Sequence, residues 1–231
     1  MTLAAVLFDL DGTLVDTLPI CYLAFRGALE RAGAPTLTDG EIHALFGPSE
    51  EGMMQRVRPE DWERVLPAYF AEYERLLASC PAVVPELVDA LALVRERGIR
   101  TALVTGKSRV TATMSVHHFG LADAFDGIEC GSPQGVVKAD AIRRLLERWR
   151  LSPADAVYVG DGAADMVAAR EAGVLAAGAA WAQGARVTEL KDARADVIFT
   201  DAREFRAWLD AATRGIATQT VSRPRPSSGP R

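Results

Sequence analysis

Acidic residues follow two apolar runs of this sequence. The segment 9–13, Asp-Leu-Asp-Gly-Thr, comes directly after the run at 4–8, and the segment 160–165, Gly-Asp-Gly-Ala-Ala-Asp, ends the run at 156–160. In an open parallel sheet, ligands gather at the carboxyl ends of the strands, so we expect at least three of these carboxylates to share one crevice. Neighbouring carboxylates repel one another, and an all-oxygen set of this kind is typical of a Mg²⁺ site. Taken by itself, the segment 9–13 could be a solvated turn. A second acidic cluster at the end of another strand favours a metal-binding or catalytic site instead.

A lysine and a strand-to-helix turn offer groups that could bind phosphate. The chain has only three lysines, Lys107, Lys138 and Lys191. Lys138 begins a predicted helix, so its ammonium and the helix N-terminus can face the same anion. Thr105 and Gly106 add a hydroxyl and backbone N–H groups at the end of another strand. We therefore expect a phosphate group beside the carboxylates, with an ordinary surface lysine as the alternative for Lys138.

Lys107 lies in the segment Gly-Lys-Ser at 106–108, which resembles the end of a phosphate-binding P-loop. The first glycine of that motif would fall at position 101, where this chain has Thr101. We therefore predict no nucleotide site of this type. Lys107 is expected to be a surface residue at the start of a helix.

Apolar runs and helical patterns alternate along most of the chain. Continuous apolar runs are typical of parallel strands buried on both faces, and helices between them indicate a doubly wound α/β fold with a parallel sheet. Glycines at 33, 98 and 173 are expected to end helices in the left-handed conformation. The predicted strands span residues 4–8, 101–105, 127–130, 156–160 and 196–199, and the predicted helices span 85–97, 109–119, 138–149 and 163–172.

Residues 15–80 interrupt this alternation, because they contain helical patterns and no convincing strand. An amphipathic segment covers 18–32, Thr38 and Glu41 form a capping box, and aromatic and aliphatic residues recur at helical spacing within 59–79. The chain ends in a stretch rich in Ser, Pro, Arg and Gly, which offers little to bury. The predicted organisation is an α/β core at 1–14 and 81–212, an inserted all-helical domain at 15–80, and a disordered tail at 213–231.

The composition of the chain excludes several classes of protein. The 231 residues include 26 Lys and Arg against 31 Asp and Glu, and the net charge of −5 gives no basic excess for a nucleic-acid partner. The longest apolar stretches fall well short of the roughly 20 residues that a membrane span needs. The sequence starts without the pattern of a secretion signal, and its three cysteines suggest neither disulfides nor a zinc site. We expect a cytoplasmic protein, monomeric or homodimeric, that binds neither nucleic acid nor membranes.

Four segments match, in order along the chain, the motifs of one enzyme family. They are the segment 9–13, Thr105, Lys138 and the segment 160–165. By these motifs the sequence resembles the haloacid dehalogenase superfamily of phosphohydrolases, over about residues 2–210. The helical insertion resembles the type 1 cap of that family, and the residues after Thr13 resemble the branch of phosphoglycolate phosphatase and β-phosphoglucomutase.

This resemblance implies a two-step phosphoryl transfer that depends on Mg²⁺. Asp9 would attack phosphorus to form an aspartyl-phosphate, and Asp11 would protonate the leaving oxygen and then activate water. Thr105, Gly106 and Lys138 would hold the phosphoryl oxygens. The residues that bind or orient the metal would be Asp9, Asp11 through its carbonyl, Asp161 and Asp165.

The insertion would select the substrate, a small phosphorylated metabolite, by closing over the crevice. Its expected contact is the loop that contains Gly47, Pro48 and Ser49, and Arg56 could recognise a carboxylate or a second phosphate. A solvated helix face is an equal alternative for that arginine. Phosphoglycolate, a sugar phosphate, a nucleotide monophosphate and pyrophosphate all stay open as substrates.

Single residues distinguish other activities of the same family from the phosphatase. A phosphomutase of the β-phosphoglucomutase type carries a cap histidine at the position where this chain has Cys21, although His43 keeps the mutase open. A phosphonate hydrolase of this architecture needs a lysine in the insertion, and residues 15–80 contain none. A catalytically inactive binding or regulatory module is the remaining alternative, and the presence of Asp9 and Asp11 argues against it.

Overall fold

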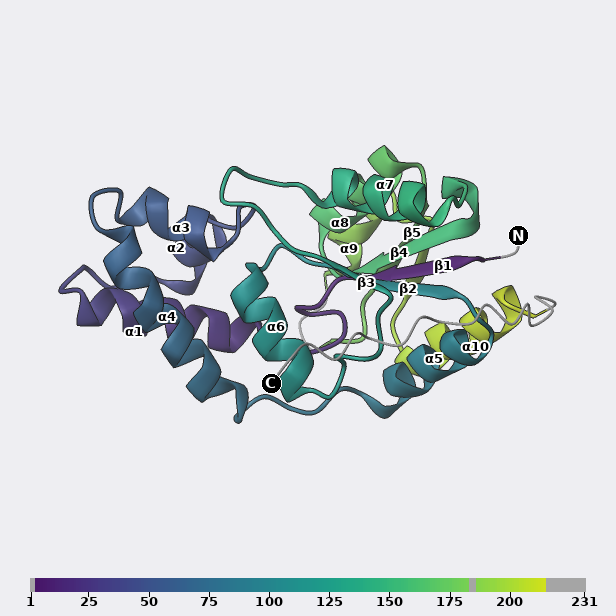
Figure 1. Cartoon of the computed structure of the whole chain (residues 1–231), viewed down its shortest axis with the longest axis horizontal. Coiled ribbons are helices and arrows are strands. Elements are labelled where there is room, and N and C mark those ends of the chain that lie inside the picture. The colour runs from purple at the N-terminus through teal and green to yellow at the C-terminus, as the bar shows by residue number, and fades with distance from the viewer. Residues whose placement is uncertain (1–2, 183–185, 215–231) are drawn as a thin grey trace, which may run out of the picture.

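The computed structural model describes residues 3–182 and 186–214, and it contains a six-stranded parallel sheet (Figure 1). Its strands are β1 (Ala5–Phe8), β2 (Arg100–Val104), β3 (Gly127–Glu129), β4 (Ala156–Gly160), β5 (Leu175–Ala179) and β6 (Val197–Phe199). Their order across the sheet is β3-β2-β1-β4-β5-β6. β1 therefore lies between β2 and β4, and the carboxyl ends of these three strands are neighbours.

β1 consists only of apolar residues because both of its faces are covered. Val6 and Phe8 belong to the hydrophobic cluster on one face of the sheet, and Ala5 and Leu7 belong to the cluster on the other. Successive side chains of a strand point to opposite faces, so a core on both sides requires a continuous apolar run. All four side chains are fully buried, and β1 therefore holds the next residue, Asp9, on a rigid support.

Helices cover both faces of the sheet (Figure 1). On one face lie α5 (Pro85–Glu96) and α10 (Ala202–Ala212), where Phe205 of α10 meets Phe8 of β1 edge to face. On the opposite face lie α7 (Lys138–Trp149), α8 (Ala163–Ala172) and α9 (Val187–Asp192).

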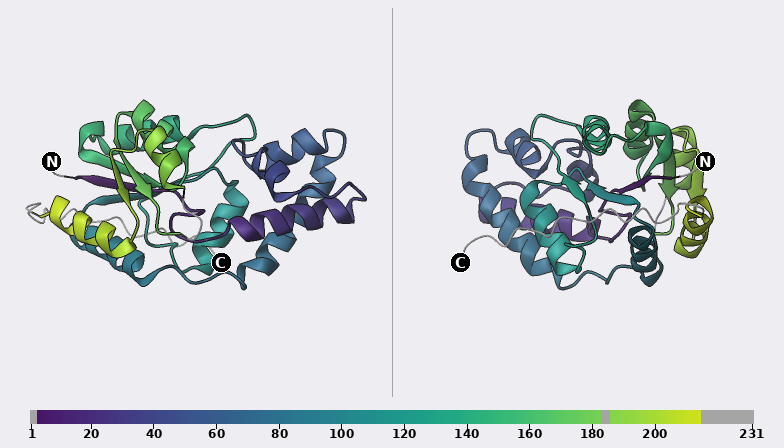
Figure 2. Two further views of the ribbon diagram at one scale, coloured as in Figure 1. Left: turned by 180° about the vertical axis from the view of Figure 1, so that it is seen from behind. Right: turned by 45° about the vertical axis from the view of Figure 1, so that its right-hand side comes forward.

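Four helices between β1 and β2 form a separate layer beyond the carboxyl ends of the strands (Figures 1 and 2). This layer, which we call the helical insert, consists of α1 (Leu18–Arg31), α2 (Asp39–His43), α3 (Glu50–Val57) and α4 (Trp62–Leu77). α1 packs along α4 around Phe25, Tyr69 and Tyr73, which are almost completely buried. Tyr73 shares a hydrogen bond of 2.8 Å with Ser115 of α6 (Arg109–His118), and this bond joins the insert to the core.

The predicted α/β fold is confirmed, and every strand and helix predicted for the core lies within one residue of its expected bounds. Gly33, Gly98 and Gly173 have the predicted positive φ. The sequence patterns do not predict β5, α9 and α10. The sequence of β5, Leu-Ala-Ala-Gly-Ala, has a low β propensity, but its small residues fit where the sheet is crowded. A Cβ at Gly178 would lie 3.0 Å from the Leu190 side chain of α9.

The boundaries predicted for the insertion, after residues 14 and 80, fall in the connections before α1 and after α4. The tail predicted at 213–231 lies outside the described residues from 215 onward. Its first residue, Thr213, is buried, donates a hydrogen bond of 2.7 Å to the Leu209 carbonyl and accepts one from Arg97. The packed chain therefore extends past the predicted boundary. Within the described ranges, no helix is both long and apolar enough to cross a membrane.

Candidate active site

The carboxyl ends of β1, β2 and β4 open into a cavity of about 460 Å³ between the sheet and the helical insert. Asp9 follows β1, Gly106 follows the end of β2, and Asp161 follows β4. All three residues line the cavity, as do Lys138 at the start of α7 and Asp165 in the first turn of α8. The sheet therefore brings most residues of the predicted site to one cavity, whereas Thr105, also predicted to bind phosphate, lies outside the lining.

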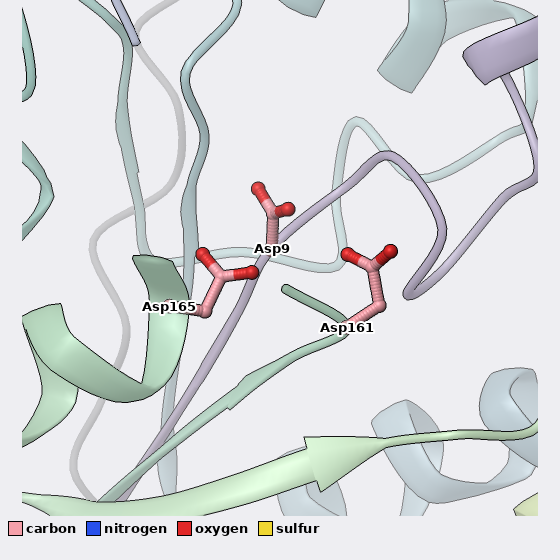
Figure 3. A group of neighbouring side chains, drawn as sticks. All are labelled: Asp9, Asp161 and Asp165. Atoms are coloured by element: carbon pink, nitrogen blue, oxygen red, sulfur yellow. The ribbon is translucent and has the colours of Figure 1, made fainter. Parts of the chain in front are cut away.

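Three carboxylates face one another at the base of this cavity (Figure 3). One oxygen from each of Asp9, Asp161 and Asp165 lies within 4.8 Å of the other two. Hydrogen bonds hold Asp165 in place, because its carboxylate accepts from the Gly162 N–H at 3.0 Å and from the Tyr158 hydroxyl at 3.1 Å. Asp161 thus lies on the turn after β4 and Asp165 in the first turn of α8, and both face the nucleophile candidate that follows β1.

Gly12 permits this close approach of the first acidic loop to Asp161. Its φ is +75°, a conformation that side chains rarely adopt. A Cβ at position 12 would lie 2.2 Å from Asp161 Oδ2, which no side chain tolerates. The glycine of the Asp-Leu-Asp-Gly-Thr segment is therefore required by the packing of one acidic segment against the other.

The burial of these carboxylates changes their proton affinity. The pKa of Asp9 is raised to about 7, chiefly by burial; the Lys138 ammonium opposes this rise, and the nearby charges of Asp165 and Asp11 add to it. Burial, followed by the charges of Asp165 and Asp9, also raises the pKa of Asp161 well above its usual range. In the protein alone, the folded state thus disfavours full ionisation of the acidic group.

Lys138 is the cation that the structure places in this group. Its Nζ lies 2.6 Å from Asp165 Oδ1 and 3.0 Å from Asp9 Oδ1. Burial alone would lower the pKa of Lys138, but the charges of Asp165 and Asp9 outweigh burial and raise it. The lysine therefore stays charged beside the nucleophile candidate, as expected for a group that contacts phosphate.

The acidic group has the features of a divalent-cation site. Asp9 Oδ1 is buried and accepts no hydrogen bond from the described residues, although it is ion-paired with Lys138. One ammonium cannot neutralise three carboxylates. The atoms that these three residues offer to a metal ion are all carboxylate oxygens. A hard cation such as Mg²⁺ fits both the charge and the donor set of Asp9, Asp161 and Asp165.

Lys107 is a residue of this site that the sequence reasoning missed. The prediction of a surface residue was wrong, because Lys107 is only 4% exposed. Its Nζ donates a hydrogen bond of 3.2 Å to Asp11 Oδ1 and another of 3.2 Å to Cys21 Sγ, and lies 4.4 Å from the centre of the Tyr73 ring. Burial alone would lower the pKa of Lys107, but the groups around it, Asp11 first among them, together outweigh burial and raise the pKa. The rarity of lysine in this chain could have pointed to a role for Lys107 in the site. The same observation supported the site role predicted for Lys138.

Glu50, at the start of α3, joins the helical insert to the same group. Its carboxylate lies 3.7 Å from Lys107 Nζ and accepts a hydrogen bond of 2.5 Å from the Ser108 N–H and one of 2.6 Å from Thr111 Oγ1. Ser108 and Thr111 stand at the N-terminus of α6, where backbone N–H groups and the helix dipole favour an anion. Lys107 is therefore held between Asp11 of the core and Glu50 of the insert.

The other predicted phosphate-binding residues lie on the turn after β2. Gly106 lines the cavity, and its carbonyl oxygen would lie 2.0 Å from a Cβ at Gly131, so glycine is needed at position 131. Thr105 is buried, and its Oγ1 accepts a hydrogen bond of 3.2 Å from the Lys107 N–H. The Thr105 hydroxyl therefore shapes the turn that carries Gly106 and Lys107.

The residues predicted to select the substrate divide into two pairs. Gly47 and Pro48 line the cavity. Ser49 is buried and does not line it, and its hydroxyl bonds to Glu51 at 2.5 Å. Arg56 is exposed, lies outside the lining and donates a hydrogen bond of 3.5 Å to the Leu45 carbonyl. The structure therefore gives no support to the idea that Arg56 recognises a second anionic group, because α3 carries it away from the cavity.

A doubly wound sheet that presents acidic residues and a lysine to one cavity is the arrangement expected of an enzyme that acts on phosphate esters, and comparisons with known proteins agree. The model of the haloacid dehalogenase-like hydrolase family matches residues 6–179, and the chain belongs to this family. A phosphoglycolate phosphatase of Neisseria meningitidis is 31% identical over 191 residues, which cover 78% of this chain and 81% of that protein. The chain is therefore an enzyme of the phosphatase type.

Solved structures show the same fold. A haloacid dehalogenase-like hydrolase of Streptococcus pneumoniae is 27% identical and superposes with a TM-score of 0.72, over 89% of this chain and 98% of that one. The CbbY protein of Rhodobacter sphaeroides, solved in complex with phosphate, is 23% identical with a TM-score of 0.74, over 88% of this chain and 96% of that one. The likeness to CbbY concerns the fold alone.

Proposed function

We propose that this phosphatase uses Mg²⁺ and an aspartyl-phosphate intermediate on Asp9 to hydrolyse a small phosphorylated metabolite. The observation that carries the proposal is the buried group of Asp9, Asp161 and Asp165 with Lys138 at 3.0 Å and 2.6 Å from two of them. Placing three carboxylates this close together lowers the stability of the folded protein unless a further cation binds them. Bound by these three carboxylates and the Asp11 carbonyl, Mg²⁺ would keep Asp9 ionised and offset the charge of the transferred phosphoryl group.

Asp9 is the nucleophile of the proposed reaction. Its carboxylate oxygen forms a bond to phosphorus as the bond from phosphorus to the leaving oxygen breaks. The ammonium of Lys138 and the N–H groups of the turn at Gly106 hold the phosphoryl oxygens and stabilise their charge. Because β1 is buried on both faces, Asp9 is held in the orientation that attack requires.

Asp11 moves the proton in both steps. In the first step it donates a proton to the leaving oxygen, and in the second it takes a proton from the water that attacks the aspartyl-phosphate. Lys107 and Thr17 donate hydrogen bonds to its Oδ1 and so orient the carboxylate. Lys107 is thus a positioning residue for the acid and base.

The helical insert acts as a cap over the crevice. Gly47 and Pro48 lie in the cavity wall, and Glu50 bonds to the N-terminus of α6. An insert held in this way excludes water from the phosphorylated enzyme and surrounds the leaving group of the substrate.

Release of inorganic phosphate from a panel of phosphorylated metabolites, with Mg²⁺ or with chelator, tests the proposal. Asp9→Asn removes the nucleophile, and Asp89→Asn on the exposed face of α5 is the matched control. We expect Mg²⁺-dependent release by the wild type and the control but none by Asp9→Asn. Acid-quenched wild-type protein should also carry a hydroxylamine-labile phosphoryl group on Asp9.

The same experiment distinguishes the alternatives. Retained activity in Asp9→Asn would overturn the nucleophile assignment. A folded wild-type protein that binds Mg²⁺ but releases no phosphate from any compound would favour the binding module. Conversion of one sugar phosphate isomer into another, without net release, would favour the mutase.

A further inference from the structure

The cavity wall beyond the acidic group is largely apolar. This part of the wall comes from the helical insert and from the segment before α7. Several of its members are also core residues of the insert, so their positions are fixed by packing. The apolar residues of this part of the wall include Tyr22, Phe46, Pro48, Met53, Tyr69 and Val136.

Three rings in this wall form one preassembled aromatic surface. The rings of Tyr22 and Phe46 stack with an interplanar angle of 15° and centroids 5.9 Å apart. The His43 ring lies 5.0 Å from Phe46, and its Nδ1 is hydrogen-bonded to the Tyr22 hydroxyl at 3.1 Å. A planar group can stack on such a surface without ordering it first.

Each lysine and arginine of the described lining has a carboxylate partner, although Arg186 is exposed and its pair lies on the surface. Lys138 is paired with Asp9 and Asp165, and Lys107 is paired with Asp11 and Glu50. The third cation, Arg186, lies 3.3 Å from Glu189. The carboxylates that line the cavity are Asp9, Asp11, Asp16, Glu50, Asp161, Asp165 and Glu189.

This excess of negative charge constrains what the substrate can carry. The phosphate group of a substrate would be matched by Lys138 and by the divalent cation of the acidic group. A carboxylate or second phosphate on the leaving group would add to this excess of carboxylates over cations in a largely apolar wall, where burial of a further negative charge is costly. The volume of about 460 Å³ also suits a ligand larger than a two-carbon acid.

We infer that the substrate is a phosphate monoester whose leaving group is uncharged and carries a planar, apolar ring that stacks on the surface of Tyr22, His43 and Phe46. This inference rests on the proposed phosphatase function and names its substrate class. Phosphate esters of hydroxy acids and bisphosphates are the classes that it disfavours.

A matched pair of substrates tests the charge part of the inference. Phenyl phosphate and 4-carboxyphenyl phosphate have the same ring and leaving groups of similar acidity, and they differ by one carboxylate. We expect kcat/KM to be at least about 100-fold higher for phenyl phosphate, since like charges in an interface are strongly unfavourable. A ratio near one, or a preference for the carboxylate or for phosphoglycolate, would overturn the inference.

Two variants of Phe46 test the aromatic part. Phe46→Ala should raise KM for phenyl phosphate about tenfold more than it raises KM for methyl phosphate, because methyl phosphate carries no ring. Phe46→Arg should improve the use of 4-carboxyphenyl phosphate relative to phenyl phosphate. Phe70→Ala is the matched control, since Phe70 packs in the insert outside the cavity lining. Equal effects of Phe46→Ala on both substrates would contradict the stacking role.

Binding separates this inference from the proposed function. The Asp9→Asn protein cannot form the intermediate, so calorimetry in the presence of Mg²⁺ measures its affinity for the two aryl phosphates directly. Tighter binding of phenyl phosphate supports the inference even if the wild type hydrolyses neither compound, in which case only the proposed function fails. Equal binding, or no binding of phenyl phosphate at millimolar concentration, would overturn the inference.

Discussion

Replacement of Lys107 by Met tests the buried group that joins the core to the helical insert. Lys107 lies 3.2 Å from an oxygen of Asp11 and 3.7 Å from an oxygen of Glu50, and its side chain is 3% exposed. Met fills a similar volume, so the variant removes the charge and leaves little empty space. Two carboxylates would then face each other without a cation between them.

The expected loss of stability follows from that geometry. Removing one partner of a buried ion pair costs about 3–5 kcal/mol, because the remaining charge stays buried and unpaired. We expect the lower end, about 3 kcal/mol, since Glu50 keeps its bonds to Ser108 and Thr111. For a chain of this length, that loss lowers Tm by about 6–12 °C. Urea unfolding of wild type and Lys107→Met measures it.

A double-mutant cycle with Glu50→Gln identifies the cause of the loss. Glu50→Gln removes the second carboxylate, so the double variant should be more stable than the sum of the single losses predicts, by about 1 kcal/mol or more. kcat of Lys107→Met should fall at least about tenfold, because Asp11 loses an orienting hydrogen bond. A stability loss below about 1 kcal/mol, or strict additivity in the cycle, would refute the reasoning.

Three further predictions follow from the acidic group and its supports. Asp161→Ala should raise the Mg²⁺ concentration for half-maximal phosphate release at least about tenfold, and an unchanged Mg²⁺ titration would contradict its role as a ligand. Gly12→Ala should lower activity and destabilise the fold by at least about 1 kcal/mol, because position 12 has positive φ and faces Asp161. Gly40→Ala, whose Cβ meets no atom within 4 Å, is the neutral control, and equal effects of the two changes would be evidence against the packing argument. Without metal, Asp9 binds its proton more tightly in the folded state, since burial raises its pKa from 3.8 to about 7. The free energy of unfolding of the metal-free protein should therefore fall as pH rises from about 4 to about 7, less steeply in Asp9→Asn, and thermal melts that show no such difference would contradict it.

Much of the fold could be predicted from the sequence because parallel strands buried on both faces leave an unambiguous apolar pattern. β1 and β4 are examples, and each ends at the acidic residue that matters for the site. β5 could not be predicted in the same way, since its small residues reflect the side chain of Leu190 that packs over Gly178. That contact joins residues that only the folded chain brings together.

Those residues of the candidate site that come after the ends of strands could be predicted from the sequence. Asp9, Asp161 and Lys138 belong to this class, because the topology of a parallel sheet alone brings them to one edge. The environment of Lys107 depends instead on where Glu50 of the insert falls, and no local pattern encodes the packing of α3 against the N-terminus of α6. The wrong prediction for Lys107 and the unsupported one for Arg56 both arose from this dependence.

The helical insert enters the chain between two neighbouring strands and adds no strand to the sheet. Evolution could therefore exchange or reshape the helices α1 to α4 while every pairing of the sheet, and with it the acidic group, stayed the same. The ion pairs of Lys107 restrict this freedom, because a transplanted insert would have to supply a carboxylate at the position of Glu50. In directed evolution or in the design of chimeric enzymes, the helical insert is best treated as a replaceable module whose contacts with the core at Glu50 and Tyr73 must be kept.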